Sequence, residues 1–326
     1  MKVAFLTEMG FNSKIPSTHT NMRTEFAWMC LLDAKHYNLY KYQAVKGYDI
    51  VFIIFPKGMV YLSANGTKIK DGINPATALL ELPLVETLKD NNNKVYYIQE
   101  GANWWWNDYS VIDQFRFLNL LSDTDGIFAH NEFDSLYYKG MFPNKKVETI
   151  RTLMIDSLIK NIIPAPEEKV LIGGNFAHWY GGFESYIIAS NFELPIWVPS
   201  SHAKRKNEEY VENLNHFKWL DWLDWMRIVS TFKYAVHLMP TIAAGTFSLN
   251  CAYFGIPTIG NIKVDTQRIL HPELSVDVGD VNSARRLAIE LKNDIEFYKH
   301  CSDVCKENYN KFYKTDSWLA DMLNKL

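Results

Sequence analysis

The chain has 326 residues, of which 48% are hydrophobic and 14% aromatic, which is enough for one large or two medium hydrophobic cores. Its 37 acidic and 34 basic residues nearly cancel, leaving a net charge of −3, so no global positive field indicates a nucleic-acid binder, although a local basic face stays possible. No apolar run approaches the length of a membrane span, and Met1 leads straight into a predicted strand. We therefore expect a cytoplasmic protein without a membrane partner.

Predicted strands and helices alternate along the first half of the chain. Strands are expected at 2–6, 49–55, 94–99 and 126–130. Helical patterns such as 22–34, 76–90 and 111–121 lie between them. This order is typical of a parallel sheet, and it predicts one Rossmann-like domain over residues 1–165.

A second α/β domain is expected over residues 166–326. It follows a proline and charge cluster at 164–168, which has the composition of a linker. Its strands are expected at 169–173, 194–198, 216–220, 234–239, 257–260 and 275–278. The helical segment 281–326 has enough apolar positions to cross back to the first domain. Two facing Rossmann-like domains enclose a deep cleft between their strand ends, where such sheets bind ligands.

The most informative segment is YAVHLMPTIAAGTFSLNCAYFGIPTIG, at 234–260. Its apolar strand stops before Pro240, and the small residues Ala244 and Gly245 let backbone N–H groups approach an anion closely. The helix expected from Thr246 onwards presents its N-terminus to that anion. The pattern predicts a nucleoside diphosphate site.

A second glycine segment, VLIGGNFAHWYGGFESY, opens the second domain at 170–186. Gly173 and Gly174 follow a buried strand, and Gly181 and Gly182 precede a helix, an arrangement that suits close backbone contact with a ligand. The segment has neither the spacing of a dinucleotide fingerprint nor the Lys-Ser/Thr ending of a phosphate-binding P-loop. Dehydrogenase and kinase functions are therefore disfavoured.

Together the two segments resemble the donor half of GT-B glycosyltransferases, in which a proline, a glycine turn and a helix precede Gly-x-Pro. A more specific resemblance is to the bacteriophage DNA β-glucosyltransferases, which glucosylate 5-hydroxymethylcytosine in duplex DNA. It is carried by KVYYIQEG at 94–101, VLIGGNFAHWYGGFES at 170–185 and KVDTQRIL at 263–270, about a tenth of the chain. The resemblance implies an α/β GT-B fold, a UDP-sugar co-substrate, and double-stranded DNA containing hydroxymethylated cytosine as partner, in the host cytoplasm if the protein is phage-encoded.

The resemblance also implies a set of donor-binding residues. Asn250 stands seven residues before Pro257, where the family has a ribose-binding glutamate, so an uncharged amide would bond the ribose hydroxyl. The arginines of the family's glycine loop are absent, and backbone N–H groups, His178 or Arg268 would take their part. The full expected set is Gly173, Gly174, Asn175, His178, Ala244, Gly245, Thr246, Asn250 and Arg268.

Attack by a hydroxyl on the anomeric carbon of a sugar requires removal of its proton. Glu100 ends a predicted strand and is the leading candidate base, one place before Gly101, where the family has its acid. Glu8 and Asp108 are the other candidates, while Glu25 fits a helix face. If Glu100 acts in a single displacement, the anomeric configuration inverts; the alternative is a hydrogen-bonded carboxylate at a strand end.

Acceptor contacts are expected from aromatic and basic side chains. Three consecutive indoles, Trp104 to Trp106, cannot all enter one core face, so Trp104 or Trp105 is expected to stack on a base or sugar, with domain packing as the alternative. The basic run Lys204, Arg205 and Lys206 fits either a solvated loop or a phosphate contact. Arg23 also lies near the expected cleft.

No metal site is expected. Cys30, Cys251, Cys301 and Cys305 lack zinc spacing and are expected as reduced thiols. Asp123-Thr124-Asp125 resembles the metal motif of the other major glycosyltransferase fold, but it precedes a strand and is interpreted as a turn. No tightly bound cofactor is expected, and Mg²⁺ would at most stimulate. Two alternatives stay open: a GT-B transferase for a glycan or small molecule, and a non-catalytic nucleotide-binding protein.

Overall fold

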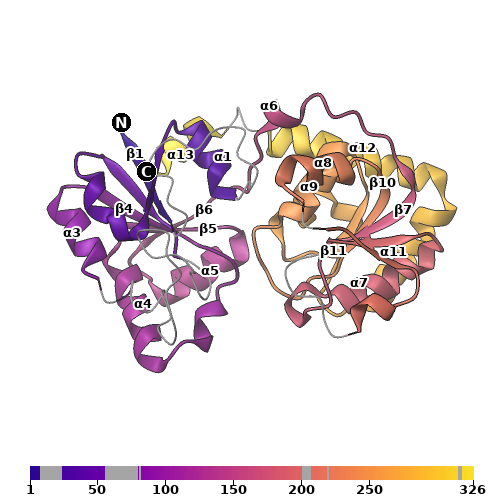
Figure 1. Cartoon of the computed structure of the whole chain (residues 1–326), viewed down its shortest axis with the longest axis horizontal. Coiled ribbons are helices and arrows are strands. Elements are labelled where there is room, and N and C mark those ends of the chain that lie inside the picture. Colours follow the sequence, from indigo (N-terminus) through magenta and orange to yellow (C-terminus); the bar gives the residue numbers. More distant parts are fainter. Residues whose placement is uncertain (8–23, 56–79, 81, 200–206, 219, 315–317) are drawn as a thin grey trace. The chain divides into compact units, whose positions relative to one another are not determined.

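Two six-stranded parallel sheets carry the fold in the computed structural model (Figure 1). The structure describes residues 1–7, 24–55, 80, 82–199, 207–218, 220–314 and 318–326. Their contacts divide the chain into two units. The N-terminal unit holds the described residues of 1–7, 25–151 and 318–326, and the C-terminal unit holds Thr24 and the described residues of 152–314. The predicted domain limits, 1–165 and 166–326, differ from these units and stay a prediction.

The sheet of the N-terminal unit has the strand order β2-β1-β3-β4-β5-β6, with all its strands parallel. Figure 1 shows α3 and α4 on one side of this sheet and α1 and α13 on the other. The elements are β1 Val3–Thr7, α1 Thr24–Leu31, β2 Lys35–Asn38, η1 Leu39–Val45, β3 Ile50–Ile53, α3 Leu84–Asp90, β4 Lys94–Ile98, η2 Trp105–Asp108, α4 Val111–Asp123, β5 Gly126–Ala129, α5 Glu132–Met141, β6 Lys146–Thr149 and α13 Leu319–Asn324.

The sheet of the C-terminal unit has the order β12-β11-β10-β7-β8-β9, also parallel. Helices α8, α9 and α12 cover one face, and α7 and α11 the other (Figure 1). The elements are α6 Asp156–Ile159, β7 Glu167–Ile172, η3 His178–Tyr180, α7 Gly182–Ala189, η4 Ser190–Phe192, β8 Ile196–Val198, η5 Glu208–Tyr210, β9 Leu214–His216, α8 Trp222–Val229, β10 Phe232–His237, α9 Thr246–Phe254, β11 Thr258–Asn261, α10 Asp265–Leu270, η6 Pro272–Leu274, β12 Ser275–Val276, α11 Val281–Asn293 and α12 Ile295–Phe312.

The last residues of the chain pack on the N-terminal sheet. The rings of Phe5, Phe52, Tyr96 and Phe128 follow one another across one face of the sheet, with centroids 4.8 to 5.9 Å apart. The Tyr96 hydroxyl donates a 2.6 Å hydrogen bond to the Leu326 carbonyl. The C-terminal residues thus contact the face of the N-terminal sheet that carries these aromatic rings.

The predicted fold class, α/β with two Rossmann-like domains, is confirmed, with two local corrections. The strand β2 was not predicted, because KHYN is short and mostly polar and forms a partly exposed sheet edge. The strand β9 lies at Leu214–His216 rather than at 216–220; it too is a short edge strand. Among the described residues, no helix combines the length and hydropathy needed to span a membrane.

Candidate active site

The two glycine segments meet where the strand order of the C-terminal sheet reverses. The strands β7 and β10 are neighbours at the centre, and the chain proceeds outward from β7 through β8 to β9 and from β10 through β11 to β12. Ligands of open parallel sheets bind outside the carboxyl ends of the strands at this reversal. The residues after β7 begin with Gly173, and those after β10 lead to Gly245. The fold therefore brings both predicted donor segments to one edge of one sheet.

Both helices that follow these central strands begin at a left-handed glycine without a side-chain cap. Gly181 precedes α7 with φ +62° and Gly245 precedes α9 with φ +71°. Among the described residues, five other α-helices have a capping side chain that accepts a hydrogen bond from their first turn, namely those of Ser110, Asn131, Asp221, Asp280 and Asp294. The helices α3, α6, α10 and α13 also lack a side-chain cap, but none of them begins at a left-handed glycine. First-turn N–H groups without a side-chain acceptor, together with the helix dipole, favour an anion.

The start of α7 lies against the end of β10. A Cβ on Gly181 would be 2.0 Å from the Leu238 carbonyl oxygen, so only glycine fits there. The Ser185 hydroxyl donates to the Gly181 carbonyl at 2.7 Å and accepts from the Leu238 N–H at 2.9 Å. Because Ser185 is buried and both of its bonds are made, the two segments have a fixed spacing.

The loop before α9 is held through its carbonyl groups. Thr152 Oγ1 donates to the Ala244 carbonyl at 2.6 Å, and Thr266 Oγ1 donates to the Gly245 carbonyl at 2.8 Å. A Cβ on Gly245 would be 2.0 Å from Thr266 Oγ1. These two threonines fix the orientation of the peptide groups that lead into Thr246, the first residue of α9.

The remaining predicted donor-binding residues differ in their burial and in their hydrogen-bond or ion-pair partners. Asn250 is 5% exposed; with its amide oriented to satisfy both ends, its oxygen accepts from Trp225 Nε1 at 2.9 Å and its nitrogen donates to the Thr246 carbonyl at 3.2 Å. Asn175 is also buried, and it accepts from the Ala177 N–H at 3.1 Å in a turn after β7. Arg268 lies on α10 and pairs with Asp265 at 3.1 Å. The His178 side chain lies outside the described part.

One residue of this edge was missed by the sequence reasoning. His237 is the last residue of β10 and packs against Gly173, whose Cβ would be 2.3 Å from the imidazole. Its ring centroid lies 5.0 Å from that of Phe247, in the first turn of α9. Burial lowers the pKa of His237 to about 4, so the imidazole is neutral at pH 7. A single histidine at a strand end matches no motif, and only its proximity to the glycine segments could have drawn attention to it.

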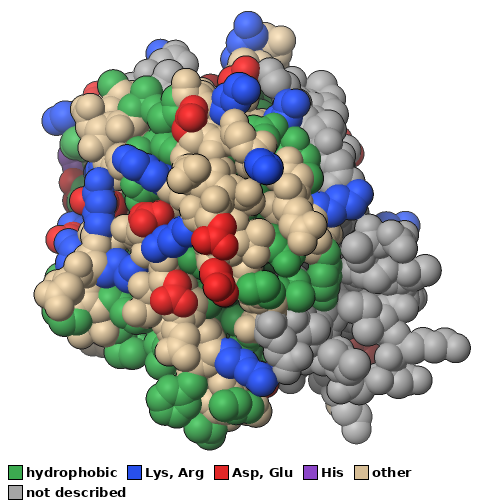
Figure 2. All heavy atoms as spheres, turned by 90° about the vertical axis from the view of Figure 1, so that its left-hand side faces the viewer, with side chains coloured by type: hydrophobic (Ala, Val, Ile, Leu, Met, Phe, Trp, Pro, Cys, Tyr) green, Lys and Arg blue, Asp and Glu red, His purple; other side chains and the backbone are tan. Residues whose placement is uncertain are grey.

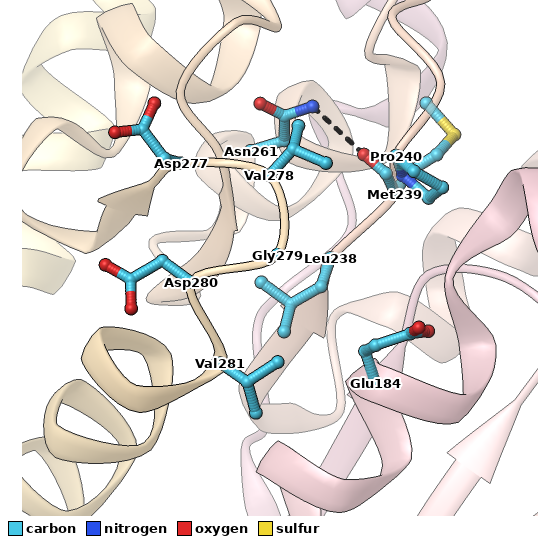
Figure 3. A pocket seen from close by; sticks show the side chains of 10 residues that line it. All are labelled: Glu184, Leu238, Met239, Pro240, Asn261, Asp277, Val278, Gly279, Asp280 and Val281. Carbon is cyan, nitrogen blue, oxygen red and sulfur yellow. Dashed lines mark hydrogen bonds between the residues drawn. The ribbon is translucent and has the colours of Figure 1, made fainter.

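A pocket of about 100 Å³ opens beside the same edge, over β10, β11 and β12. Figure 3 shows the carboxylates of Asp277 and Asp280 on one side and that of Glu184 on the other, around Leu238. Asn261 closes the floor by donating to the Met239 carbonyl at 3.0 Å. Three carboxylates repel a diphosphate, so the anion is expected outside this pocket and nearer the start of α9 than that of α7, whose first turn carries Glu184.

The leading candidate base lies at the carboxyl edge of the N-terminal sheet. Glu100 is half-buried, two residues after the end of β4, and Gly101 follows it in the left-handed region with φ +72°. The neighbouring Gln99 is fully buried and donates to the Gly101 carbonyl at 2.8 Å and to Asp134 Oδ2 at 2.7 Å. These bonds hold the chain in place on both sides of Glu100.

Further polar groups surround this strand end. Asn131 caps α5 and donates to Asp134 Oδ2 at 2.8 Å, while the Asp134 N–H returns a bond to Asn131 Oδ1 at 2.8 Å. His130, directly after β5, is buried beside them, and its N–H reaches Gln99 Oε1 at 3.4 Å. Burial raises the pKa of Tyr97, so its hydroxyl stays protonated. The region offers carboxylates and hydrogen-bond donors in a partly buried setting, which general acid–base chemistry requires.

The three indoles separate into one exposed and two buried side chains. Trp104 is 40% exposed, whereas Trp105 and Trp106 are 8% and 4% exposed and pack on Phe117. A ligand can therefore reach Trp104, while the burial of Trp105 argues against its predicted contact with the acceptor and fits the packing alternative.

Several candidates fall outside what the structure describes. They are Glu8, Arg23, Lys204, Arg205, Lys206 and the side chain of Asp108. Glu25, expected on a helix face, is buried in α1. Within the described ranges, no group of three or more His, Cys, Asp or Glu side chains could hold a metal ion. All four cysteines are free thiols, and three of them are buried.

No family model and no curated protein sequence matches the chain. Solved structures do resemble it. HepE from Anabaena, solved with UDP and glucose, is similar over the whole of both chains, with a TM-score of 0.69 at 9% identity. An α-glucosyltransferase solved with UDP and a 13-mer DNA containing an HMU base matches over 99% of this chain and 98% of its own, with a TM-score of 0.64 at 10% identity.

Sucrose-phosphate synthase from Thermosynechococcus elongatus is similar over 99% of this chain and 98% of its own, with a TM-score of 0.62 at 12% identity. At such identities the likeness concerns the fold. Two parallel sheets of Rossmann-like topology, together with these neighbours, show that the chain has the GT-B fold.

Proposed function

We propose that the protein is a glycosyltransferase that moves a sugar, glucose or arabinose, from a UDP-sugar to the hydroxymethyl group of 5-hydroxymethylcytosine in DNA. The observation that carries the transferase part is the pair of uncapped helices, α7 and α9, which start at left-handed glycines beside the two central strands of one sheet. Their N–H groups and dipoles can hold a diphosphate without a basic side chain.

We assign the two parts of the transfer reaction to the carboxyl edges of the two sheets. The departing nucleoside diphosphate gains negative charge as the sugar bond breaks, and the starts of α7 and α9 would stabilise that charge. Glu100 would accept the proton of the attacking hydroxyl. One direct displacement of this kind inverts the anomeric carbon. The solved neighbours with UDP or UDP and glucose support the choice of donor.

The DNA acceptor rests on the resemblance of three segments to DNA β-glucosyltransferases and on the similar α-glucosyltransferase solved with DNA. Exposed Trp104 provides an aromatic face for an extruded base. Figure 2 shows one face of the N-terminal unit with acidic and basic side chains interspersed. The described side chains of that face form no basic stripe.

The decisive test is mass spectrometry of nucleosides from hydroxymethylcytosine-containing DNA after incubation with the protein and a panel of UDP-sugars. A mass gain of one hexose or pentose would establish both donor and acceptor. NMR of the product sugar would then give its anomeric configuration. Unmodified DNA together with UDP released in the presence of another acceptor would reject the DNA acceptor and keep the transferase.

A second candidate is a GT-B transferase with a glycan or small-molecule acceptor. It is favoured by the similarity to sucrose-phosphate synthase, whose name indicates a small product, at a TM-score close to that of the DNA-bound neighbour. A non-catalytic nucleotide-binding protein is the third. It would bind UDP-sugar and release no UDP with any acceptor.

A further inference from the structure

His237 lies at the carboxyl edge of the sheet, and its side chain fits there only because the neighbouring residue, Gly173, has no side chain. The strands β7 and β10 pair with Ile172 opposite Val236, so the next residues, Gly173 and His237, stand side by side. A Cβ on Gly173 would lie 2.3 Å from the imidazole Cγ. The missing side chain of a residue already predicted to bind the donor is thus what makes room for the histidine.

The two nitrogens of this imidazole have different surroundings. Nε2 is buried and has no hydrogen-bond partner among the described residues. The residue as a whole stays partly exposed, and Nδ1 is not among the buried nitrogens without partners. The ring edge that carries Nδ1 is therefore the edge that a ligand can reach.

The buried nitrogen decides which tautomer forms. Burial lowers the pKa of His237 to about 4, so one proton remains on the ring at pH 7. A buried N–H without an acceptor is costlier than a buried lone pair without a donor. The proton is therefore expected on Nδ1, which makes the accessible edge a neutral hydrogen-bond donor.

Burying the Nε2 atom without a hydrogen-bond partner is unfavourable, which indicates that the histidine has a function other than packing. An apolar side chain would fill the space beside Phe247 without leaving a polar atom unsatisfied, so packing alone does not explain a histidine here. The atoms of His237 nearest to Gly173 are Cγ, Cβ and Cδ2, so the Cδ2–Nε2 edge faces Gly173 and the Nδ1 edge faces away from it. The ring as a whole packs beside Phe247 in the first turn of α9. The pocket with the three carboxylates lies over β10, β11 and β12.

We propose that His237 binds the donor, with Nδ1–H donating a hydrogen bond to a diphosphate oxygen held at the start of α9. This inference rests on the proposed function and deepens it, because it names the side chain that takes the part of the absent loop arginines. A neutral donor at this place stabilises the leaving diphosphate without adding a charge that would slow its release.

Two substitutions separate the nitrogens. The amide nitrogen of asparagine can stand close to the place of Nδ1, whereas that of glutamine reaches toward the place of Nε2. We would measure UDP and uridine binding by calorimetry for wild type, His237→Asn, His237→Gln and His237→Leu. His300→Gln, at an exposed histidine of the same unit, is the control. Thermal unfolding would show that each variant is folded.

We expect His237→Asn and the control to bind UDP within about threefold of wild type, and His237→Gln and His237→Leu to lose about tenfold or more. Uridine, which lacks the phosphates, should lose no affinity in any variant. Equal UDP binding by all variants would overturn the inference and leave the proposed function intact, as would an equal loss for UDP and uridine. A wild type that binds no UDP would overturn both.

Discussion

In the N-terminal unit, the helices that follow β4 and β5 begin with the capping side chains Ser110 and Asn131, and Asn131 also donates to Asp134. In the C-terminal unit, the helices that follow β7 and β10 begin at left-handed glycines, with no side-chain cap. Both edges belong to parallel sheets of six strands in Rossmann-like order. The architecture is shared, and the first residues after each strand differ.

The difference assigns separate tasks to the two edges. The cap of each of the helices α4 and α5 accepts from one first-turn N–H, that of Asp113 or Asp134, so fewer N–H groups remain to attract an anion to the edge of the N-terminal sheet. An uncapped helix that starts at glycine keeps its N–H groups for a ligand. We infer that base chemistry belongs to the first edge and diphosphate binding to the second. Substitutions on one edge should then leave the other's function intact.

The largest effect is expected from Glu100→Gln. The amide keeps the shape of the side chain but cannot accept a proton, so sugar transfer should fall by about 100-fold or more while UDP affinity stays unchanged. The measurement is the initial rate of UDP release alongside UDP calorimetry. Glu148→Gln, on β6 of the same sheet, is the matched control. Full transfer by Glu100→Gln would remove this residue from the mechanism.

Gly245→Ala tests the other edge. An alanine there must adopt φ +71° and place its Cβ 2.0 Å from Thr266 Oγ1, so the loop and the start of α9 must shift. We expect UDP affinity to fall about tenfold or more. Gly47→Ala is the control, because Gly47 has φ +84° and no atom within 4 Å of the added Cβ. Unchanged UDP binding by Gly245→Ala would mean that the anion does not contact α9.

The regular parts of both edges follow from local sequence. Alternating strand and helix patterns are typical of parallel sheets, and parallel strands place their following residues at one edge, so the segments of Gly173 and Gly245 could be predicted to lie at the same edge. Glu100 could be placed at a strand end by the same reasoning. The sequence pattern does not show which residues, distant along the chain, contact one another in the folded protein.

Three features of the structure depend on such tertiary neighbours. Trp105 looked like a loop residue, and its burial against Phe117 depends on a helix that follows in the chain. Asn250 was read from the spacing to Gly-x-Pro, while its tertiary contact with Trp225 has no local signal. His237 became notable only through the glycine opposite. Each role is set by a partner that periodicity does not identify.

Acid should weaken the C-terminal unit through His271. Burial lowers the pKa of His271 to about 4, and its Nε2 donates to the Ser248 carbonyl of α9 at 3.1 Å. A folded-state pKa below the unfolded value of about 6.5 means that the unfolded chain binds the proton more tightly. The stability from neutral His271 is complete above pH 6.5 and declines as the pH falls toward 4.

Urea unfolding at pH 7.5 and pH 5 measures this contribution. Between these values the wild type should lose about 2 kcal/mol on account of His271 alone. His271→Gln keeps a donor for Ser248 and does not titrate, so its loss should be smaller by that amount. An identical pH dependence for the two proteins would show that His271 already carries its proton when folded.

The smallest effect is expected from Ser110→Ala, which removes the cap of α4 in the N-terminal unit. Ser110 accepts from the Asp113 N–H at 3.3 Å and donates to Asp113 Oδ2 at 2.6 Å, so its removal leaves the first turn of α4 without a cap. The free energy of unfolding should fall by about 1 kcal/mol, with UDP affinity unchanged. Chemical denaturation and UDP calorimetry test both statements. A loss of UDP affinity in Ser110→Ala would contradict the separation of the two edges, because uncapping α4 should alter only the edge that holds no diphosphate.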